Sequence, residues 1–262
     1  MSELDDDTAV RAAGAGTWSG SVSPRWNVGS APNGGYLLAL AARAMLAASG
    51  RPDPLSVTAH YVTPPEPGAV TVTTEVVRAG RRYATVAAAL CQGGAERVRL
   101  LSATGDLAAQ EGPTRVAAEP PGIPGPDACE PLAGERLPEA VHRYDLRLPP
   151  GSPTPAGPSD GRPFEVTGWI RLADGSVPCA LALLAFADAF PPTVLRPLGV
   201  GWVPTIELTV HVRGRPAPGW VLGAFRTRFL VDGLLEEDGE LWGEDGRLLA
   251  HARQLALILP RR

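Results

Sequence analysis

The sequence predicts an α+β protein that is built from two similar halves. Three observations carry this prediction: an internal repeat, one long apolar helix in each half, and a set of alternating strands that follows each helix. The chain has 262 residues, 44% of them hydrophobic. This length fits one large domain or two domains of about 130 residues each.

The repeat is visible when the sequence is shifted by 151 residues, so that Leu55–Gly68 falls on Ile206–Gly219. The coinciding pairs are Thr58/Thr209, His60/His211, Pro65/Pro216, Pro67/Pro218, Gly68/Gly219 and, just beyond, Val70/Val221. A second match, at a shift of 148, places Arg99–Ala108 on Arg247–Ala256. Strand periodicity does not explain the shared Pro-x-Pro-Gly spacing, so we interpret the two matches as a duplicated domain rather than a chance likeness of two strands.

Each half has one stretch that is typical of a buried helix. Leu37–Ala48 in the first half contains no helix breaker and is apolar on nearly all sides, and Pro178–Ala189 is its counterpart in the second half. A short aromatic strand is expected within residues 17–28. Alternation of apolar and polar residues predicts the other strands: Leu55–Thr63, Ala69–Arg78, Arg82–Cys91, Arg97–Leu107, Phe164–Leu172, Thr205–Val212, Trp220–Val231, Gly239–Trp242 and Arg247–Leu259.

A proline-rich segment separates the halves. Glu111–Pro163 holds 13 of the 28 prolines, which excludes a helix or a central strand over most of its length. We expect a surface linker with one extended piece at His142–Leu148. The predicted organisation is an N-terminal domain (1–110), the linker (111–163) and a C-terminal domain (164–262).

Composition excludes several classes of protein. All 24 basic residues are arginine, so enzymes that need a Schiff-base lysine or a phosphate-binding P-loop lysine are excluded. The net charge of −4 argues against nucleic acids and anionic membranes as partners. Three distant cysteines give neither a disulfide framework nor a zinc site. The acidic start and the absence of a long apolar run predict a cytoplasmic protein without a signal peptide, and no pattern calls for a cofactor or metal.

Several short motifs resemble those of acyl-CoA thioesterase II-like proteins. In the first half these are Pro32-Asn-Gly-Gly-Tyr36, His60 with Pro65-x-Pro-Gly68, and Arg78-x-Gly-Arg-Arg82. In the second half they are Ala187-Asp-Ala189, Pro204-Thr205, His211 and Arg253-Gln254. The resemblance covers nearly the whole chain outside the linker and termini. It implies a double hotdog, in which two fused hotdog folds each wrap an antiparallel sheet around a central helix.

The resemblance also implies an activity: hydrolysis of an acyl-CoA thioester to a carboxylic acid and CoA, within fatty acid metabolism. In that family an Asp, a Thr and a Gln hold the water that attacks the thioester, and the matching residues here are Asp188, Thr205 and Gln254. Double hotdogs pair their halves internally, and their outer faces leave room for a homodimer.

Taken alone, each of these three residues also has a plainer interpretation. Asp188 is either a costly carboxylate at the end of an apolar helix, suited to act as a base, or a solvated helix-end residue. Thr205 can reflect strand propensity alone. Gln254 lies in an apolar strand, where a buried amide needs partners and can orient a water. The two sequence shifts give Pro54 and Asp106 as the counterparts of Thr205 and Gln254, so one catalytic site per chain is expected.

The other candidate residues also have structural interpretations. The N–H groups of Gly34 and Gly35 are candidates for an oxyanion hole, but both glycines could instead serve close packing at the helix entry. His60 and His211 are interpreted as structural, because duplicated residues at matched strand positions usually serve the fold. Arg78, Arg81 and Arg82 either form a solvated turn or contact the phosphates of CoA.

Two alternative functions stay open. The first is a hotdog hydratase or dehydratase of enoyl thioesters, although the Asp–His stretch typical of such enzymes is missing. The second is a non-catalytic acyl-thioester binding protein, against which the presence of all three residue types argues.

Overall fold

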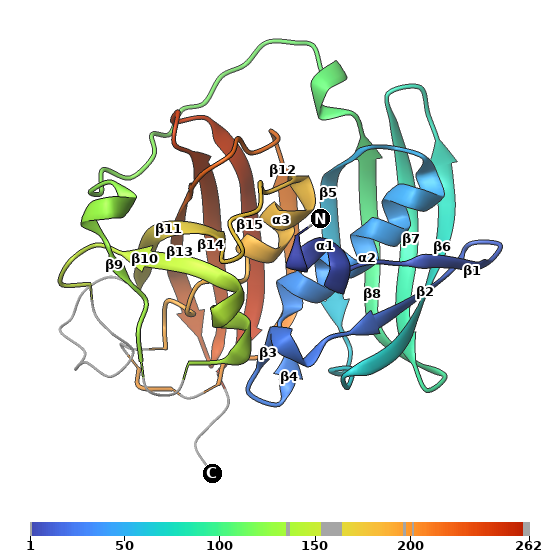
Figure 1. Ribbon diagram of the computed structural model, residues 1–262, viewed down its shortest axis with the longest axis horizontal. Coiled ribbons are helices and arrows are strands. Elements are labelled where there is room, and N and C mark those ends of the chain that lie inside the picture. Colours follow the sequence, from blue (N-terminus) through green and yellow to red (C-terminus); the bar gives the residue numbers. More distant parts are fainter. Residues whose placement is uncertain (1, 135–136, 153–163, 196–197, 201, 259–262) are drawn as a thin grey trace.

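A computed structural model describes residues 2–134, 137–152, 164–195, 198–200 and 202–258. Its main feature is one antiparallel sheet of 13 strands in the order β1-β2-β6-β7-β8-β5-β12-β15-β14-β13-β11-β10-β9 (Figure 1). Two central helices, α2 and α3, lie against the sheet (Figure 1). This is the α+β double hotdog that the sequence predicts.

The first half comprises the elements before the proline-rich segment. They are α1 (Glu3–Asp7), β1 (Arg11–Gly14), β2 (Thr17–Val22), β3 (Asn27–Val28), β4 (Ala31–Pro32), α2 (Gly34–Ser49), β5 (Asp53–Tyr61), β6 (Gly68–Ala79), β7 (Tyr83–Gln92) and β8 (Ala95–Gly105). The predicted helix and four long strands are confirmed, with ends that differ by a few residues.

The second half repeats this plan. Its elements are β9 (Glu130–Pro131), β10 (Tyr144–Leu148), β11 (Glu165–Leu172), α3 (Ala180–Phe186), β12 (Thr205–Val212), β13 (Val221–Val231), β14 (Leu234–Gly243) and β15 (Leu248–Leu257). Helix α3 is shorter than predicted and ends before Asp188. Strand β14 is longer than predicted, because its alternation of buried and exposed residues begins at Leu234 rather than Gly239. The predicted end of the last strand, Leu259, lies outside the described residues.

The two halves meet where β5 pairs with β12. The strand order is symmetrical about this pair, with β8, β7, β6 and β2 on one side and β15, β14, β13 and β11 on the other. Thr58 pairs directly with Thr209, and their hydroxyl oxygens lie 2.9 Å apart. These two threonines coincide in the repeat of 151 residues, so each faces its own counterpart across a local twofold axis. The structure thus confirms the first repeat match.

The second repeat match is wrong by four residues. Leu208 pairs with Gln254, whereas its counterpart Val57 pairs with Ser102, so the register relates β8 to β15 by a shift of 152 rather than 148. The counterpart of Gln254 is therefore Ser102, and Asp106 instead lies 3.2 Å from Arg215. The similar apolar sequences of the two strands allowed this slip. Serine in place of glutamine leaves the expectation of one triad per chain unchanged.

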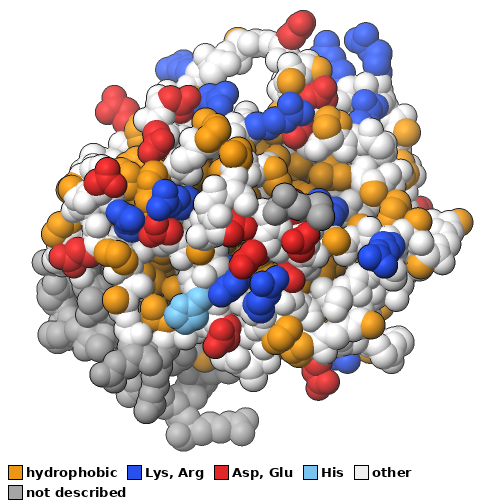
Figure 2. Space-filling view, in the orientation of Figure 1, with side chains coloured by type: hydrophobic (Ala, Val, Ile, Leu, Met, Phe, Trp, Pro, Cys, Tyr) orange, Lys and Arg blue, Asp and Glu red, His pale blue; other side chains and the backbone are white. Residues whose placement is uncertain are grey.

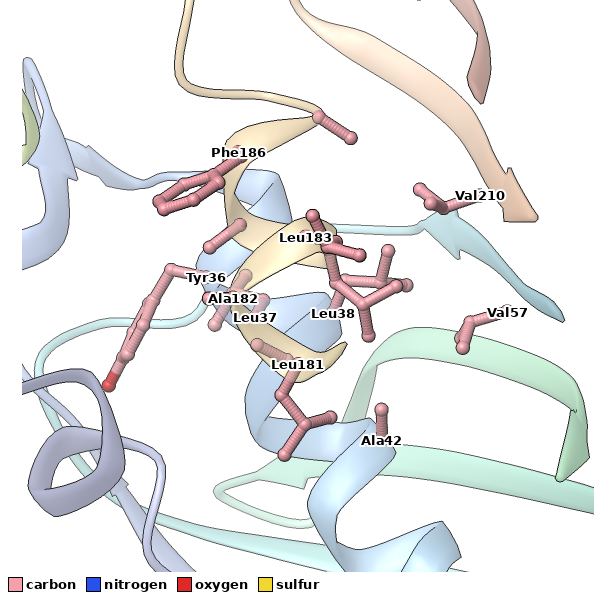
Figure 3. Packing of buried hydrophobic residues seen from close by; sticks show 14 of the residues in the cluster. Tyr36, Leu37, Leu38, Ala42, Val57, Leu181, Ala182, Leu183, Phe186 and Val210 are labelled. Carbon is pink, nitrogen blue, oxygen red and sulfur yellow. The ribbon is translucent and has the colours of Figure 1, made fainter. Parts of the chain in front are cut away.

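Helices α2 and α3 form the centre of the hydrophobic core. Buried side chains of α2, among them Leu38, meet those of α3, such as Leu183 and Phe186 (Figure 3). Val57 of β5 and Val210 of β12 point toward the helices from the sheet (Figure 3). One core thus spans both halves and holds the two helices in fixed positions.

Part of the segment expected to be a linker packs against the second half. Its predicted extended piece is confirmed as β10, which pairs with β11. Upstream, Cys129 and Ile123 pack in a cluster with Trp169, Trp220 and Trp242. The end of the predicted linker, residues 153–163, lies outside the described residues.

In the part of the chain that the structure describes, no helix is long and apolar enough to cross a membrane. Arginine and acidic side chains are interspersed over the face that contains α1 and α3 (Figure 2).

Candidate active site

The site begins where α2 begins. Asn33 caps the helix, because its Oδ1 accepts the N–H of Tyr36 at 2.9 Å. Its Nδ2 donates to the carbonyl oxygen of Asp188 at 2.7 Å and to Asp188 Oδ2 at 2.9 Å. One side chain therefore starts the helix and binds the segment that follows α3, across 155 positions of sequence.

Asp188 lies in the turn just after α3, with its carboxylate against the N-terminus of α2. Its Oδ2 also accepts the Gly35 N–H at 2.9 Å. No described residue donates a hydrogen bond to its other oxygen, Oδ1. Burial raises the pKa of Asp188 to about 6, although the N–H groups of Gly35 and Gly34 and the Asn33 amide favour the charged form. Such a carboxylate can exchange a proton near neutral pH.

Gly34 and Gly35 allow this close approach. A Cβ on Gly35 would lie 2.8 Å from the Leu184 carbonyl oxygen and 2.9 Å from that of Ala185. A Cβ on Gly34 would lie 3.0 Å from Asp188 Oδ2 and from the Tyr61 hydroxyl, which donates to the Gly34 carbonyl at 2.8 Å. The glycines thus pack closely, and the Gly35 N–H is already bonded to Asp188.

Thr205 and Gln254 meet on the inner face of the sheet. Gln254 Nε2 donates to Thr205 Oγ1 at 2.5 Å, and only 7% of Gln254 is exposed. A bulge in β12 between Thr205 and Glu207 disturbs the alternation there, and Thr205 lies opposite the fully buried Ala256. The structure therefore joins these two predicted residues directly.

Asp188 and the Gln254–Thr205 pair belong to different elements. Asp188 follows α3, whereas Thr205 lies in β12 and Gln254 in β15. Among the described residues, no hydrogen bond joins Asp188 to either partner. Glu237 pairs with Gln254 across β14 and β15.

Tyr61, Glu237 and Tyr144 were not singled out from the sequence, and Asn33 was quoted there only as part of a motif. Asn33 and Tyr61 contact the site as described above. Glu237 is buried, and continued alternation of β14 upstream of Gly239 was the signal that could have placed it on the inner face. Tyr144 lies in the expected linker, and its buried hydroxyl has no hydrogen-bond partner among the described residues. Burial, together with the nearby Asp188 charge, raises its pKa well above the usual range.

The predicted arginine cluster lies away from Asp188. Arg51, just beyond the C-terminal end of α2, donates to the carbonyl oxygens of Gly80 and Arg81 in the hairpin between β6 and β7. Asp188 contacts the opposite end of this helix, which spans 16 residues and is therefore about 24 Å long. Arg78 stacks over the ring of Tyr83 and donates to its hydroxyl.

The two duplicated histidines lie apart from the site. His60 is exposed and pairs with Glu207 across β5 and β12, while His211 stacks on His251 with ring centroids 4.7 Å apart. Within the described residues, no histidine hydrogen-bonds to Asp188, and no cluster of three or more His, Cys, Asp or Glu side chains is arranged to bind a metal.

Known proteins share this architecture. The structure of a Thermobifida fusca protein described as a thioesterase II is 31% identical and superposes with a TM-score of 0.90, covering 99% of this chain and 98% of that one. A hot dog fold protein of Alicyclobacillus acidocaldarius also gives a TM-score of 0.90, at 22% identity and full coverage of both chains. An uncharacterized protein of Mycobacterium tuberculosis is 28% identical over 92% of this chain and 90% of its own length.

Family comparison covers both halves. Residues 22–108 match the acyl-CoA thioesterase N-terminal domain, and residues 118–258 match the acyl-CoA thioesterase C-terminal domain. The second match includes Asp188, Thr205 and Gln254, and it begins within the segment that we expected to be a linker. The chain therefore belongs to the acyl-CoA thioesterase family, and the protein is a thioester hydrolase.

Proposed function

We propose that the protein hydrolyses acyl-CoA thioesters by direct attack of a water that Asp188, Thr205 and Gln254 hold. The observation that carries this proposal is the Asp188 carboxylate, whose Oδ2 accepts hydrogen bonds from the Asn33 amide and the Gly35 N–H, while its Oδ1 accepts none from the described residues. The Gln254–Thr205 pair supplies the hydroxyl and amide groups that would orient the water.

The proposed reaction needs no covalent acyl-enzyme. The oxygen of the water bonds to the thioester carbon while Asp188 takes a proton from that water. The carbonyl oxygen of the thioester becomes negatively charged. The carbon–sulfur bond then breaks, the carbonyl re-forms, and Asp188 returns the proton to the departing thiolate of CoA. The products are a carboxylic acid and free CoA, and Asp188 is ready for another cycle.

The N-terminus of α2 lies where negative charge passes from Asp188 to the thioester oxygen in the proposed reaction. Free N–H groups at a helix start stabilise negative charge, first on Asp188 and then on the thioester oxygen. For Gly34 and Gly35 to act as the oxyanion hole, the thioester oxygen would have to replace the carboxylate at one of these N–H groups. Neutralisation of Asp188 by the water proton favours that replacement.

The test is release of free CoA, followed with a thiol reagent on short, medium and long acyl-CoAs. We expect turnover on at least one chain length, and D188N should lower its kcat by about a thousandfold. Tight binding of an acyl-CoA without thiol release would instead identify a binding protein. Absence of both across the whole series would overturn the proposal.

The arginine cluster offers a separate prediction. If Arg78, Arg81 and Arg82 bind the phosphates of CoA, at the end far from the thioester, replacing all three with glutamine should raise KM several-fold and leave kcat nearly unchanged. The control is Arg115→Gln, which changes one exposed arginine outside the hairpin. Steady-state kinetics on one acyl-CoA are sufficient, and an unchanged KM would show that the hairpin is only a solvated turn.

A further inference from the structure

One peptide group at the start of α2 is hydrogen-bonded at both ends. The carbonyl oxygen of Gly34 accepts the Tyr61 hydroxyl at 2.8 Å. The N–H of Gly35, on the other side of the same peptide bond, donates to Asp188 Oδ2 at 2.9 Å. The Tyr61 hydroxyl, this peptide group and the Asp188 carboxylate therefore form one continuous chain of hydrogen bonds.

Tyr61 reaches this peptide group from the inner face of the sheet. It is the last residue of β5, two positions after the buried Ala59, and it packs against the hydrophobic core. Strand β5 pairs with β12 up to His60, which lies opposite Glu207. Tyr61 therefore lies at the end of the sheet where β12 begins with Thr205. Its side chain bridges this end of the sheet and the N-terminus of α2.

These contacts leave the peptide group little freedom. The Tyr61 hydroxyl and Asp188 Oδ2 each lie 3.0 Å from the position that a Cβ on Gly34 would occupy, so both oxygens crowd the same side of Gly34. A peptide between two glycines can otherwise rotate, because glycine adopts many backbone conformations. The carbonyl and N–H of a trans peptide point in opposite directions. A hydroxyl that holds the carbonyl of Gly34 therefore also aims the N–H of Gly35 at the carboxylate.

We propose that Tyr61 is a positioning residue that orients and polarises the Gly34–Gly35 peptide group toward Asp188. A hydrogen bond to a carbonyl oxygen draws electrons toward that oxygen and makes the N–H of the same peptide group a stronger donor. This N–H holds the carboxylate before the reaction, and it stabilises the thioester oxygen once Asp188 has taken up the proton of the water. The inference rests on the proposed role of Asp188 as the base.

Tyr36 provides a matched comparison for a purely structural role. It is fully buried and lies one residue after Gly35, but its hydroxyl bonds elsewhere. That hydroxyl accepts the Ser23 N–H at 3.0 Å and donates to the carbonyl oxygen of Asp7 at 2.9 Å. Loss of the Tyr36 hydroxyl should therefore lower stability without changing the Gly34–Gly35 peptide group.

The first test compares Tyr61→Phe with Tyr36→Phe, each of which keeps the ring and loses one hydroxyl. When acyl-CoA hydrolysis is followed by thiol release, Tyr61→Phe should lower kcat about five- to tenfold with little change in KM. The lost hydrogen bond acts on the base and not on the bound substrate. Tyr36→Phe should keep the wild-type kcat even where its unfolding free energy falls. Equal losses of kcat in the two variants would make Tyr61 a structural residue and overturn the proposal.

NMR can observe this peptide group separately from nearly all others. The sequence contains two Gly-Gly pairs, Gly34-Gly35 and Gly93-Gly94. When glycine is labelled with carbon-13 at the carbonyl and with nitrogen-15, only the amides of Gly35 and Gly94 are bonded to a labelled carbonyl. Gly94 is exposed in the turn between β7 and β8, so its amide exchanges faster with water and serves as the internal control.

In Tyr61→Phe, the signals of the Gly34 carbonyl carbon and the Gly35 amide proton should move upfield, while the Gly94 signal stays in place. A second sample does not depend on the folding of this variant: the wild-type chain with 3-fluorotyrosine, whose hydroxyl is a stronger donor. Burial raises the pKa of Tyr61 well above its usual range, so this hydroxyl stays protonated at neutral pH. The same two signals should then move downfield.

Unchanged signals of the Gly34–Gly35 peptide group in either sample would overturn the proposal. These signals are independent of turnover. If the wild type hydrolyses no acyl-CoA, the proposed function fails, and the NMR shifts still show whether Tyr61 controls this peptide group.

Discussion

Replacement of Asp188 by asparagine is expected to lower kcat by about a thousandfold, the usual order for loss of a positioned general base. Asparagine keeps the size of the side chain and an oxygen that can accept the Gly35 N–H. It cannot take the proton of the attacking water. The loss should therefore fall on kcat, with little change in KM, when acyl-CoA hydrolysis is followed by thiol release.

The same variant should gain stability at alkaline pH. The pKa of Asp188 in the folded chain, about 6, lies above its ordinary value of 3.8, so folding takes up a proton between these values. The wild type therefore loses stability as the pH rises through this window, and D188N does not. Above pH 7 we expect D188N to be more stable by about 2 kcal/mol after allowance for partial exposure.

These opposite effects separate catalysis from folding. A variant that had merely misfolded would lose both activity and stability. The matched control is Asp106→Asn, an aspartate next to Arg215 and outside the site, which should keep full kcat. A D188N enzyme with kcat within tenfold of the wild type would show that another group serves as the base.

Local patterns in the sequence were sufficient to predict much of the fold. Alternation located the long strands because each has one face on the core, and the repeat located the symmetry because Thr58 and Thr209 meet across it. The register of β15 was less secure. A strand with many similar apolar residues aligns almost equally well at neighbouring shifts, so only pairing with β12 fixes the counterpart of Gln254 as Ser102.

The site was predictable in its parts but not in its contacts. Resemblance to the family pointed to Asp188, Thr205 and Gln254, and the structure joins the last two through a hydrogen bond. The contacts of Asp188 with Asn33 and Gly35 depend on how α3 packs on α2, which no local pattern encodes. Glu237 was not predicted to lie on the inner face of the sheet, because the strand was predicted to begin after it, at Gly239.

Replacement of Gly35 by alanine is expected to have the largest effect on stability. The new Cβ would lie within 2.9 Å of two carbonyl oxygens of α3 and of the Asp188 Cβ. Carbonyl oxygens of a helix cannot move unless the helix moves, so α2 and α3 must separate. We expect a loss of about 3 kcal/mol of unfolding free energy, and kcat lower by about a hundredfold because Asp188 is displaced with α3.

Alanine variants of two other glycines serve as controls when the unfolding free energy is measured by chemical denaturation and kcat by steady-state kinetics. Gly122 is exposed and has open space around it, so Gly122→Ala should change neither stability nor kcat. In Gly34→Ala the close contacts are with the side chains of Asp188 and Tyr61, which can turn, so its stability loss should be smaller than that of Gly35→Ala. Equal stability of Gly35→Ala and the wild type would contradict the packing described for α2 and α3.

Gly35→Ala also addresses the two roles that the sequence left open for this residue. Alanine keeps the backbone N–H, so a role limited to hydrogen-bond donation would leave a correctly folded variant active. The contacts at Gly35 imply instead that donation depends on packing, because the N–H reaches Asp188 only if no side chain separates the helices. The residue is then required as a glycine so that its own N–H can reach the carboxylate.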